Sequence, residues 1–267
     1  MIKIIGQKKL VTILNNYNTI NLPHAMLFVG PEGCGKHLMA SYVATKCSLD
    51  LVLVDDAFSS EDINSFNYKT IKTLYLIDLN SYTEKQQNTI LKILEDGSST
   101  AYFVLIANSE AGVLNTVLNR CTKYTFEHYT KQEIEQITGT AINEKAFTIF
   151  KTPGKLLNMT DSSFNNIINL ADNVVKNIHR ASYANALVIS TKINYKDLYN
   201  KVDFNLFFDA VEYLSFEDFK NNANQQSFTI FKITNQFKQY AAQSSFIKET
   251  LMLNYLTTLW EAVHDVS

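Results

Sequence analysis

The chain has 267 residues, a formal net charge of -2 and a hydrophobic fraction of 46%. These values are typical of a globular protein, so they exclude wholesale disorder and a collagen-like repeat. A net charge this close to zero also excludes non-specific binding of polyanions as the main activity. Only 8 glycines and 3 prolines are present, which favours helices over a turn-rich all-β fold.

The three cysteines are too few for a disulfide framework, and their spacing fits no zinc site. The first residues lack the long apolar segment of a signal peptide. No uncharged apolar run reaches the ~18 residues that a membrane helix needs. We therefore expect a cytoplasmic protein without zinc and without a membrane segment.

Short apolar runs recur at regular spacing through the first half of the chain. They cover residues 25–29, 51–54, 73–77, 101–106 and 124–126. Near-continuous apolar runs of this length are typical of strands that are buried on both faces, as in a parallel sheet. Buried helix segments are the alternative for each run.

The first apolar run leads into a phosphate-loop pattern that precedes a helical segment. The loop consists of Gly30, Pro31, Glu32, Gly33, Cys34, Gly35, Lys36 and His37. Glycines allow backbone N–H groups to curl around phosphates, and the lysine reaches the β and γ phosphates. ATP or ADP is therefore the expected ligand. The alternative is a glycine-rich turn that no longer holds a nucleotide.

Two positions weaken this site as a catalyst of hydrolysis. His37 stands where the pattern has Ser or Thr, and imidazole is a poor ligand for Mg²⁺. Asp78 ends the third apolar run, as the Mg²⁺-holding acid of a Walker B strand does, but Leu79 follows it instead of a glutamate. We expect Mg²⁺ to bind weakly if at all. A solvent-facing histidine and a simple strand-end acid are the alternatives.

Residues 83–97 predict a helix between the third and fourth runs. Thr83 and Gln86 form a capping-box pattern at its start. Ile90, Leu91 and Leu94 share one face at helical spacing, so the helix should pack on the sheet. Further along, Thr130 and Glu133 form a second capping-box pattern. From there to the end the pattern predicts helices. An apolar stripe from Phe246 to Trp260 should be mostly core.

With these motifs placed, the chain resembles the AAA+ clamp-loader subunits of DNA polymerase III, and among them the delta-prime subunit. The segments that carry the resemblance are 4–7, 22–33, 78–96, Asn108-Ser109 and Asn119-Arg120-Cys121. The resemblance implies an α/β fold with three parts. These are an AAA+ parallel-sheet domain at 1–127, a small helical lid at 128–170 and an all-α C-terminal collar at 171–267.

The resemblance also implies roles for three residues outside the phosphate loop. Arg120 stands where the family has an arginine finger that acts in trans, and a planar guanidinium bridges phosphate oxygens better than lysine does. It is one of only two arginines in a chain with 24 basic residues; the other is Arg180, which we expect to be a solvated helix residue. Asn108 corresponds to sensor 1, and Lys155 to the sensor 2 region. Each residue also has a simpler interpretation: Arg120 as an ordinary surface arginine, Asn108 as an asparagine in a turn after a strand, and Lys155 as a solvent-exposed lysine.

The resemblance also implies a function for the chain. The resemblance implies a hetero-pentamer that opens a sliding clamp and sets it on primer–template DNA. Within it, this chain would be a stator that donates its arginine and hydrolyses little or no ATP. The family's four-cysteine zinc module is not expected, because the interval that would hold it contains only Cys47. An active AAA+ motor subunit of a reduced loader is the alternative, and a small-molecule kinase is a more distant one.

Overall fold

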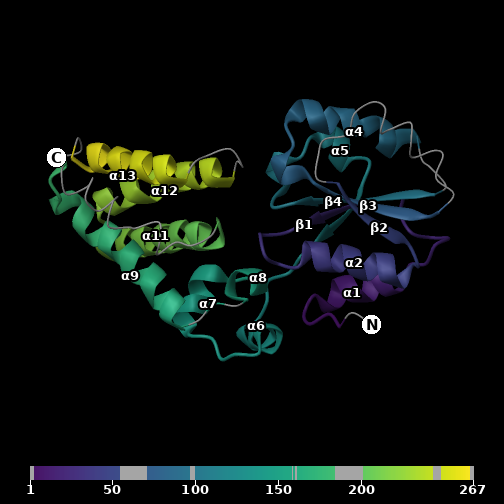
Figure 1. Cartoon of the computed structure of the whole chain (residues 1–267), viewed down its shortest axis with the longest axis horizontal. Helices are drawn as coiled ribbons and strands as arrows, with labels where there is room; N and C mark the ends of the chain where they lie inside the picture. The colour runs from purple at the N-terminus through teal and green to yellow at the C-terminus, as the bar shows by residue number, and fades with distance from the viewer. Residues whose placement is uncertain are drawn as a thin grey trace. The chain divides into compact units, whose positions relative to one another are not determined.

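A five-stranded parallel sheet forms the centre of the first part of the chain in the computed structural model (Figure 1). The structure describes residues 3–54, 71–96, 100–157, 159, 161–183, 201–242 and 248–264. The strands are β1 (Ala25–Val29), β2 (Asp50–Val54), β3 (Thr73–Asp78), β4 (Ala101–Ala107) and β5 (Thr122–Thr125). Their order is β2-β3-β4-β1-β5, and every pairing is parallel. The predicted strands and the predicted α/β fold with a parallel sheet are confirmed.

Helices cover both faces of this sheet (Figure 1). On one face lie α4 (Glu84–Asp96) and α5 (Asn115–Leu118), and on the other lie α1 (Lys8–Asn15) and α2 (Lys36–Lys46). Alternate strand residues point to opposite faces, so each strand contributes to both layers of core. Ile90 and Leu94 of α4 are buried against strand residues such as Leu27 and Phe103. The predicted packing of this helix on the sheet is therefore confirmed.

Local capping signals explain where two of the helices begin. Gln86 Oε1 accepts a hydrogen bond from the Thr83 backbone N–H at 2.8 Å, before the first turn of α4. Thr130 and Glu133 cap α6 (Lys131–Thr138) reciprocally. Gly139 ends α6 with a φ of +73°, a left-handed conformation that favours glycine. Both predicted capping boxes are confirmed.

The chain divides into two compact units. The first unit is Met1–Ala141 with Thr152–Leu157, which includes the short helix α8 (Pro153–Leu156). The second unit is Ile142–Lys151 with Asn158–Ser267. This division does not test the three domains expected from the sequence, whose boundaries stay a prediction.

The described residues of the second unit form helices. Its helices are α7 (Glu144–Phe150), α9 (Asp161–Asn177), η4 (Ile178–Arg180), α11 (Lys201–Asn222), α12 (Gln225–Ala242) and α13 (Lys248–His264). From the predicted apolar stripe, Leu251, Leu256 and Leu259 are buried in α13, whereas Leu253 is 40% exposed. Phe246 lies outside the described residues.

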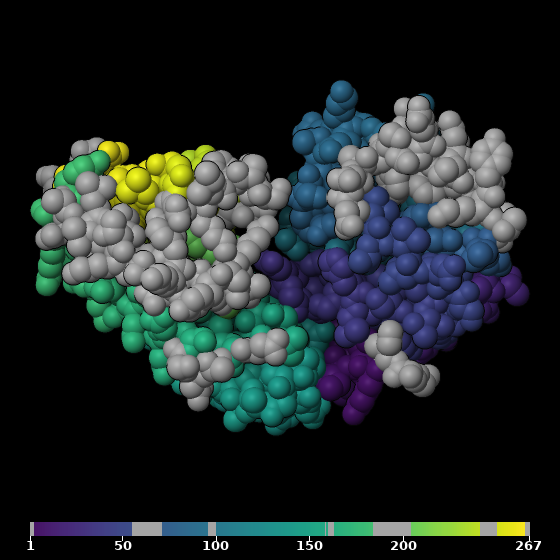
Figure 2. Space-filling model, viewed as in Figure 1, coloured from purple at the N-terminus to yellow at the C-terminus, as the bar shows by residue number. Residues whose placement is uncertain are grey.

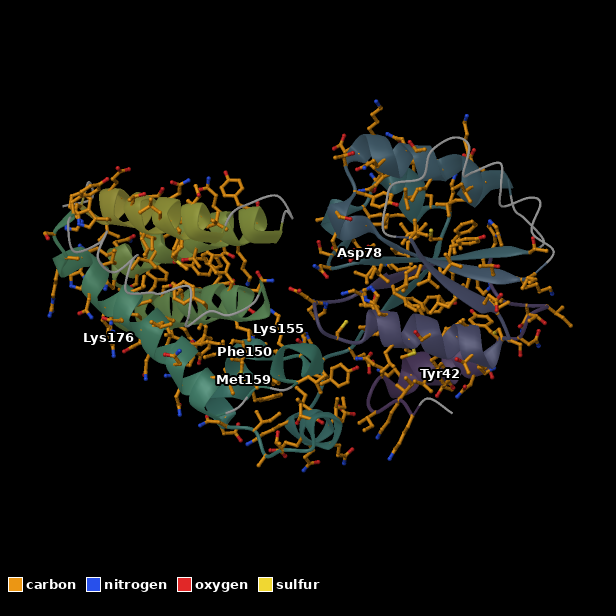
Figure 3. The ribbon with its side chains drawn as sticks, viewed as in Figure 1. Tyr42, Asp78, Phe150, Lys155, Met159 and Lys176 are labelled. Atoms are coloured by element: carbon orange, nitrogen blue, oxygen red, sulfur yellow. The ribbon has the colours of Figure 1, made fainter. Side chains whose placement is uncertain are left out.

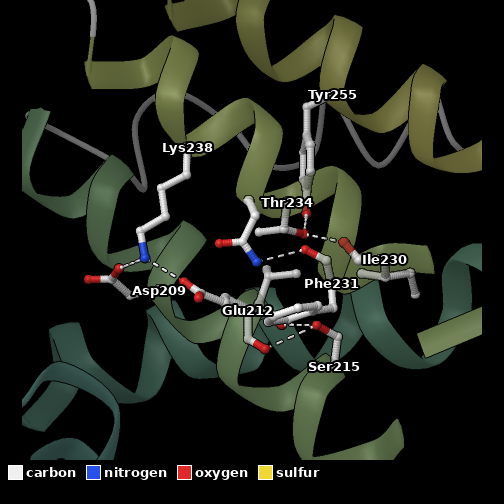
Figure 4. Close-up of polar contacts among 10 residues, drawn as sticks. Asp209, Glu212, Ser215, Ile230, Phe231, Thr234, Lys238 and Tyr255 are labelled. Carbon is white, nitrogen blue, oxygen red and sulfur yellow. Dashed lines mark hydrogen bonds and ion pairs between the residues drawn. The ribbon is translucent and has the colours of Figure 1, made fainter. Parts of the chain in front are cut away.

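Buried and half-buried polar groups tie the helices of the second unit together (Figure 4). Thr234 of α12 and Tyr255 of α13 share a buried hydrogen bond of 2.8 Å. Lys238 of α12 pairs with Asp209 of α11 at 2.6 Å and also with Glu212. Burial alone would lower the pKa of Lys238, but the two carboxylates outweigh burial and raise it. These contacts fix the register between α11, α12 and α13. None of the helices in the described part of the chain has the length and apolarity that a bilayer span requires.

Candidate functional site

The parallel sheet brings three predicted site residues to one edge. The phosphate loop follows β1, Asp78 ends β3, and Asn108 follows β4, which lies between β1 and β3. The carboxyl ends of parallel strands meet at the same edge, which is where open α/β sheets bind ligands. Asp78 lies at this edge and Lys155 in α8 (Figure 3). The topology therefore assembles the predicted site from residues far apart in the sequence.

The phosphate loop has the backbone conformation that its glycines predict. Gly33 and Gly35 have φ values of +78° and +93°, which disfavour other residues. Gly35 is the N-cap residue of α2, and Lys36 is the first residue of that helix. The helix contributes to the face of the molecule shown in Figure 2. His37, in its first turn, is exposed.

Lys36 directs its amine into the loop that carries it. Its Nζ donates to the carbonyls of Gly30 and Pro31, at 2.5 and 3.0 Å, and to Asn108 Oδ1 at 3.0 Å. The residue is only 6% exposed. Burial lowers the pKa of Lys36, against the opposing influence of Cys34, Asp78 and Glu32. The amine that would meet a phosphate is thus satisfied within the chain.

A relay of side chains joins Asp78 to Asn108. Asp78 Oδ1 accepts hydrogen bonds from the backbone N–H and the side-chain amide of Asn80, at 2.9 and 2.6 Å. Asn80 Oδ1 then accepts from the Asn108 backbone N–H at 2.8 Å. The structure therefore unites Lys36, Asp78 and Asn108 in one network. Sequence reasoning missed the connecting role of Asn80, although an Asp two residues before an Asn is a typical turn signal.

Residues 152–157 lie against the tip of the phosphate loop. Thr152 Oγ1 donates to the Glu32 carbonyl at 2.9 Å, and the Gly154 N–H donates to the Gly33 carbonyl at 2.8 Å. A Cβ on Gly33 would come within 3.1 Å of the Lys155 backbone nitrogen. The backbone of Lys155 therefore lies beside the loop, and the sensor 2 role of its side chain stays a prediction. The contacts of Thr152 and Gly154 were not anticipated.

Tyr129 closes another side of the loop. Its hydroxyl donates to the Cys34 carbonyl at 2.9 Å. Its ring packs on Gly6, where an added Cβ would lie only 2.7 Å from Tyr129 Cε1. Burial raises the pKa of Tyr129, so the phenol remains a donor. No sequence pattern indicated this residue, because the contact joins segments that are distant along the chain.

Arg120 follows α5 and has a different environment. Its Nη1 donates to the Thr116 carbonyl at 2.7 Å, and its Nη2 forms an ion pair with Glu95 of α4. The side chain is 34% exposed. The next residue, Cys121, packs against the core between α4 and the sheet, and burial raises its pKa to about 12. Arg120 is thus a surface guanidinium on a firmly packed base.

The sequence of the chain is similar to those of several DNA replication proteins. A family model described as DNA polymerase III, delta subunit, matches residues 54–130. The replication factor C small subunit of Aeropyrum pernix is 28% identical over 160 residues, 53% of this chain and 49% of that protein. Replication factor C subunit 3 of Saccharomyces cerevisiae is 23% identical over 63% of this chain and 55% of its own length. The chain therefore spans about half the length of these relatives.

One solved structure matches the fold over nearly the whole chain. It is a DNA polymerase III gamma subunit-related protein from Thermotoga maritima, with a TM-score of 0.50 and 11% sequence identity. The match covers 95% of this chain and 99% of that one. At this identity the likeness speaks for the fold alone. The family model and the replication factor C subunits show that the chain is similar in sequence to clamp-loader subunits.

Proposed function

We propose that the chain is a delta-prime-like stator of a clamp loader in DNA replication. In this role it donates Arg120 to the nucleotide of a neighbouring subunit and hydrolyses little or no ATP itself. The observation that carries the proposal is the contrast between Arg120, a partly exposed guanidinium, and Lys36, whose amine is buried in its own loop. Lys36 bears on the chain's own nucleotide site, and Arg120 bears on the nucleotide of the neighbour.

The first part concerns the chain's own nucleotide site. Gly33 and Gly35 give the loop the backbone geometry of a phosphate cradle, so the residues fit ATP or ADP in that respect. Hydrolysis also needs a group that polarises the attacking water. Leu79, which follows Asp78, is 2% exposed and belongs to the core, so it cannot supply one. His37 offers no hydroxyl to Mg²⁺. We therefore expect no turnover of a nucleotide that binds in this loop.

The second part concerns the neighbour's nucleotide. A guanidinium presents five N–H donors in a planar fork, which suits two phosphate oxygens at once. An arginine supplied in trans typically raises the rate of phosphoryl transfer about 10³-fold or more. Such a residue must lie at the surface of its own subunit, and Arg120 does so.

The partners follow from the relatives. Proteins named as replication factor C subunits match this chain, which supports assembly with other clamp-loader subunits. We propose a hetero-pentamer, with the sliding clamp and primer–template DNA as partners of the assembled complex. The second unit would form the collar of the ring and Lys155 would lie at the sensor 2 position.

Phosphate release by the purified chain tests the first part. We expect no ATP turnover above the background measured without protein. A robust turnover that Lys36→Ala abolishes would contradict the stator and favour the alternative, an active AAA+ motor subunit. That alternative is supported by the retained Lys36 and Asp78, which the structure places in one network.

A further inference from the structure

The Arg120 side chain is held by two elements at once. Thr116 in α5 accepts from Nη1 at 2.7 Å, and Glu95 in the last turn of α4 pairs with Nη2. Among the described residues the guanidinium has no other partner. Two of its five donors are therefore engaged, and three remain for another ligand.

The helix that carries Glu95 is itself fixed to the segment that carries Arg120. Gln87 of α4 is 3% exposed and donates to the Gly112 carbonyl at 2.9 Å, while its Oε1 accepts from the Leu114 N–H at 3.0 Å. Val117 of α5 is buried in the same core as Ile90 and Leu94 of α4. Glu95 therefore projects from a base that cannot shift easily relative to α5.

Glu95 could either withhold the guanidinium or orient it. Its side chain is 49% exposed, and an ion pair this exposed is weak. Such a pair cannot retain an arginine against a triphosphate, which carries several negative charges. It is sufficient to select among the rotamers of a long side chain, because little energy separates them.

From this geometry we propose that Glu95 is a positioning residue, which orients the Arg120 guanidinium toward a phosphate on a neighbouring subunit. The inference rests on the proposed role of Arg120 in trans. Glu95 itself touches neither nucleotide nor substrate. Preorganising a catalytic group typically affects the rate of the chemical step more than the binding of the substrate.

The first experiment uses the chain alone. Because the chain has two arginines, the variant Arg180→Lys leaves Arg120 as the sole arginine. With ¹⁵N-arginine, NMR then reports rotation about the Arg120 Cζ–Nε bond without ambiguity. In this background we expect Glu95→Gln to speed up that rotation by about threefold or more. Unchanged rotation would overturn the proposal.

A matched control comes from another exposed ion pair in the first unit. Glu110 pairs with Lys123 at 2.9 Å, and the two side chains are 44% and 47% exposed. Glu110→Gln therefore removes a charge of similar exposure without touching Arg120. It should leave the rotation rate unchanged, and an equal effect of both variants would show that the response to Glu95→Gln is non-specific and would sink the proposal.

The second experiment measures ATP turnover by the loader reconstituted with its sibling subunits. We expect Glu95→Gln to lower kcat by about threefold to tenfold while KM for ATP changes less than about twofold. Glu95→Ala should lower kcat further, because it also removes the hydrogen-bond acceptor. Adding Glu95→Gln to Arg120→Ala should have no additional effect.

The outcomes separate this inference from the proposed function. If Arg120→Ala lowers kcat but Glu95→Gln leaves it unchanged or raises it, Glu95 is a bystander or a competitor, and only this inference fails. If Arg120→Ala itself leaves kcat unchanged, the proposed function fails, and the positioning role falls with it.

Discussion

Lys36 and Arg120, both in the first unit, could each meet a phosphate, and their surroundings differ. Lys36 is 6% exposed, and its amine donates hydrogen bonds to Gly30, Pro31 and Asn108. Arg120 is partly exposed and keeps donors without a partner among the described residues. One group is therefore saturated by its own chain, whereas the other is oriented and still available.

Under the proposed function, this difference explains how a single fold would lack turnover at its own site and still serve a neighbour's site. The phosphate loop depends on the positive φ values of its glycines and on the contacts that Thr152 and Gly154 make with its tip. The arginine depends on α4 and α5, which pack on one face of the sheet. Since the two sites rest on different contacts, substitutions at one need not disturb the other.

The largest expected effect is that of Arg120→Ala on the reconstituted loader. We expect hydrolysis at the neighbouring site that Arg120 serves to fall by about 10³-fold, because the guanidinium would no longer stabilise charge on that nucleotide. Arg120→Lys should also be strongly impaired, since lysine lacks the planar fork. Arg180→Ala, at the other arginine, should leave turnover unchanged. Equal losses from both arginines would break the comparison.

The reactivity of the thiols should be the next largest effect. Burial raises the pKa of Cys34 in the phosphate loop, and it raises that of Cys121 beside Arg120 to about 12. Because only the thiolate reacts, iodoacetamide should modify Cys121 at least ~100-fold more slowly at pH 7.5 than in the unfolded chain. Its rate should rise about tenfold from pH 7.5 to 8.5, since this range lies far below the pKa.

Mass spectrometry of peptides from the alkylated protein measures each cysteine separately. The same protein in denaturant is the control. Rapid modification of Cys34 in the folded chain would show that the phosphate loop opens readily, and it would weaken the contrast between the two regions.

Gly154→Ala should sharpen the account of the loop's tip. Its Cβ would lie 2.7 Å from Gly33 Cα and 2.9 Å from the Gly33 carbonyl oxygen, so backbone would have to move. We expect a loss of about 1–3 kcal/mol in the free energy of unfolding, measured by denaturant titration. Gly112→Ala is the matched control, because nothing lies within 4 Å of its Cβ. An equally small effect of both variants would contradict the close contact.

Local signals allowed much of the fold to be predicted. Strand runs, capping boxes and the glycine pattern involve residues that are neighbours in the chain, so the sequence displays them directly. The contacts of Asn80, Tyr129, Gly154 and Glu95 could not be predicted in this way. Each joins segments that only the folded chain brings together, such as Tyr129 and Cys34, which are 95 positions apart. The residues that contact the site from distant segments were therefore harder to predict than the local motifs of the site itself.

The smallest expected effect is that of Lys36→Met on the reconstituted loader. Turnover should change less than about twofold, because the hydrolysed ATP would lie on a neighbour's phosphate loop. Thermal unfolding of the variant checks that it still folds, since the substitution leaves the buried carbonyls of Gly30 and Pro31 without their donor. A loss as large as that of Arg120→Ala would mean that the chain's own site turns over.

The order of the sheet has a consequence for how the protein is made. β1 pairs with β4 and β5, both of which leave the ribosome long after it. During synthesis the side chains of β1 that are fully buried in the folded protein stay unpaired with these strands; they include Met26, Leu27 and Phe28. Parallel strands with distant partners fold slowly, and until they pair they expose apolar surface that promotes aggregation. The nascent chain should therefore depend on chaperones until β4 has emerged.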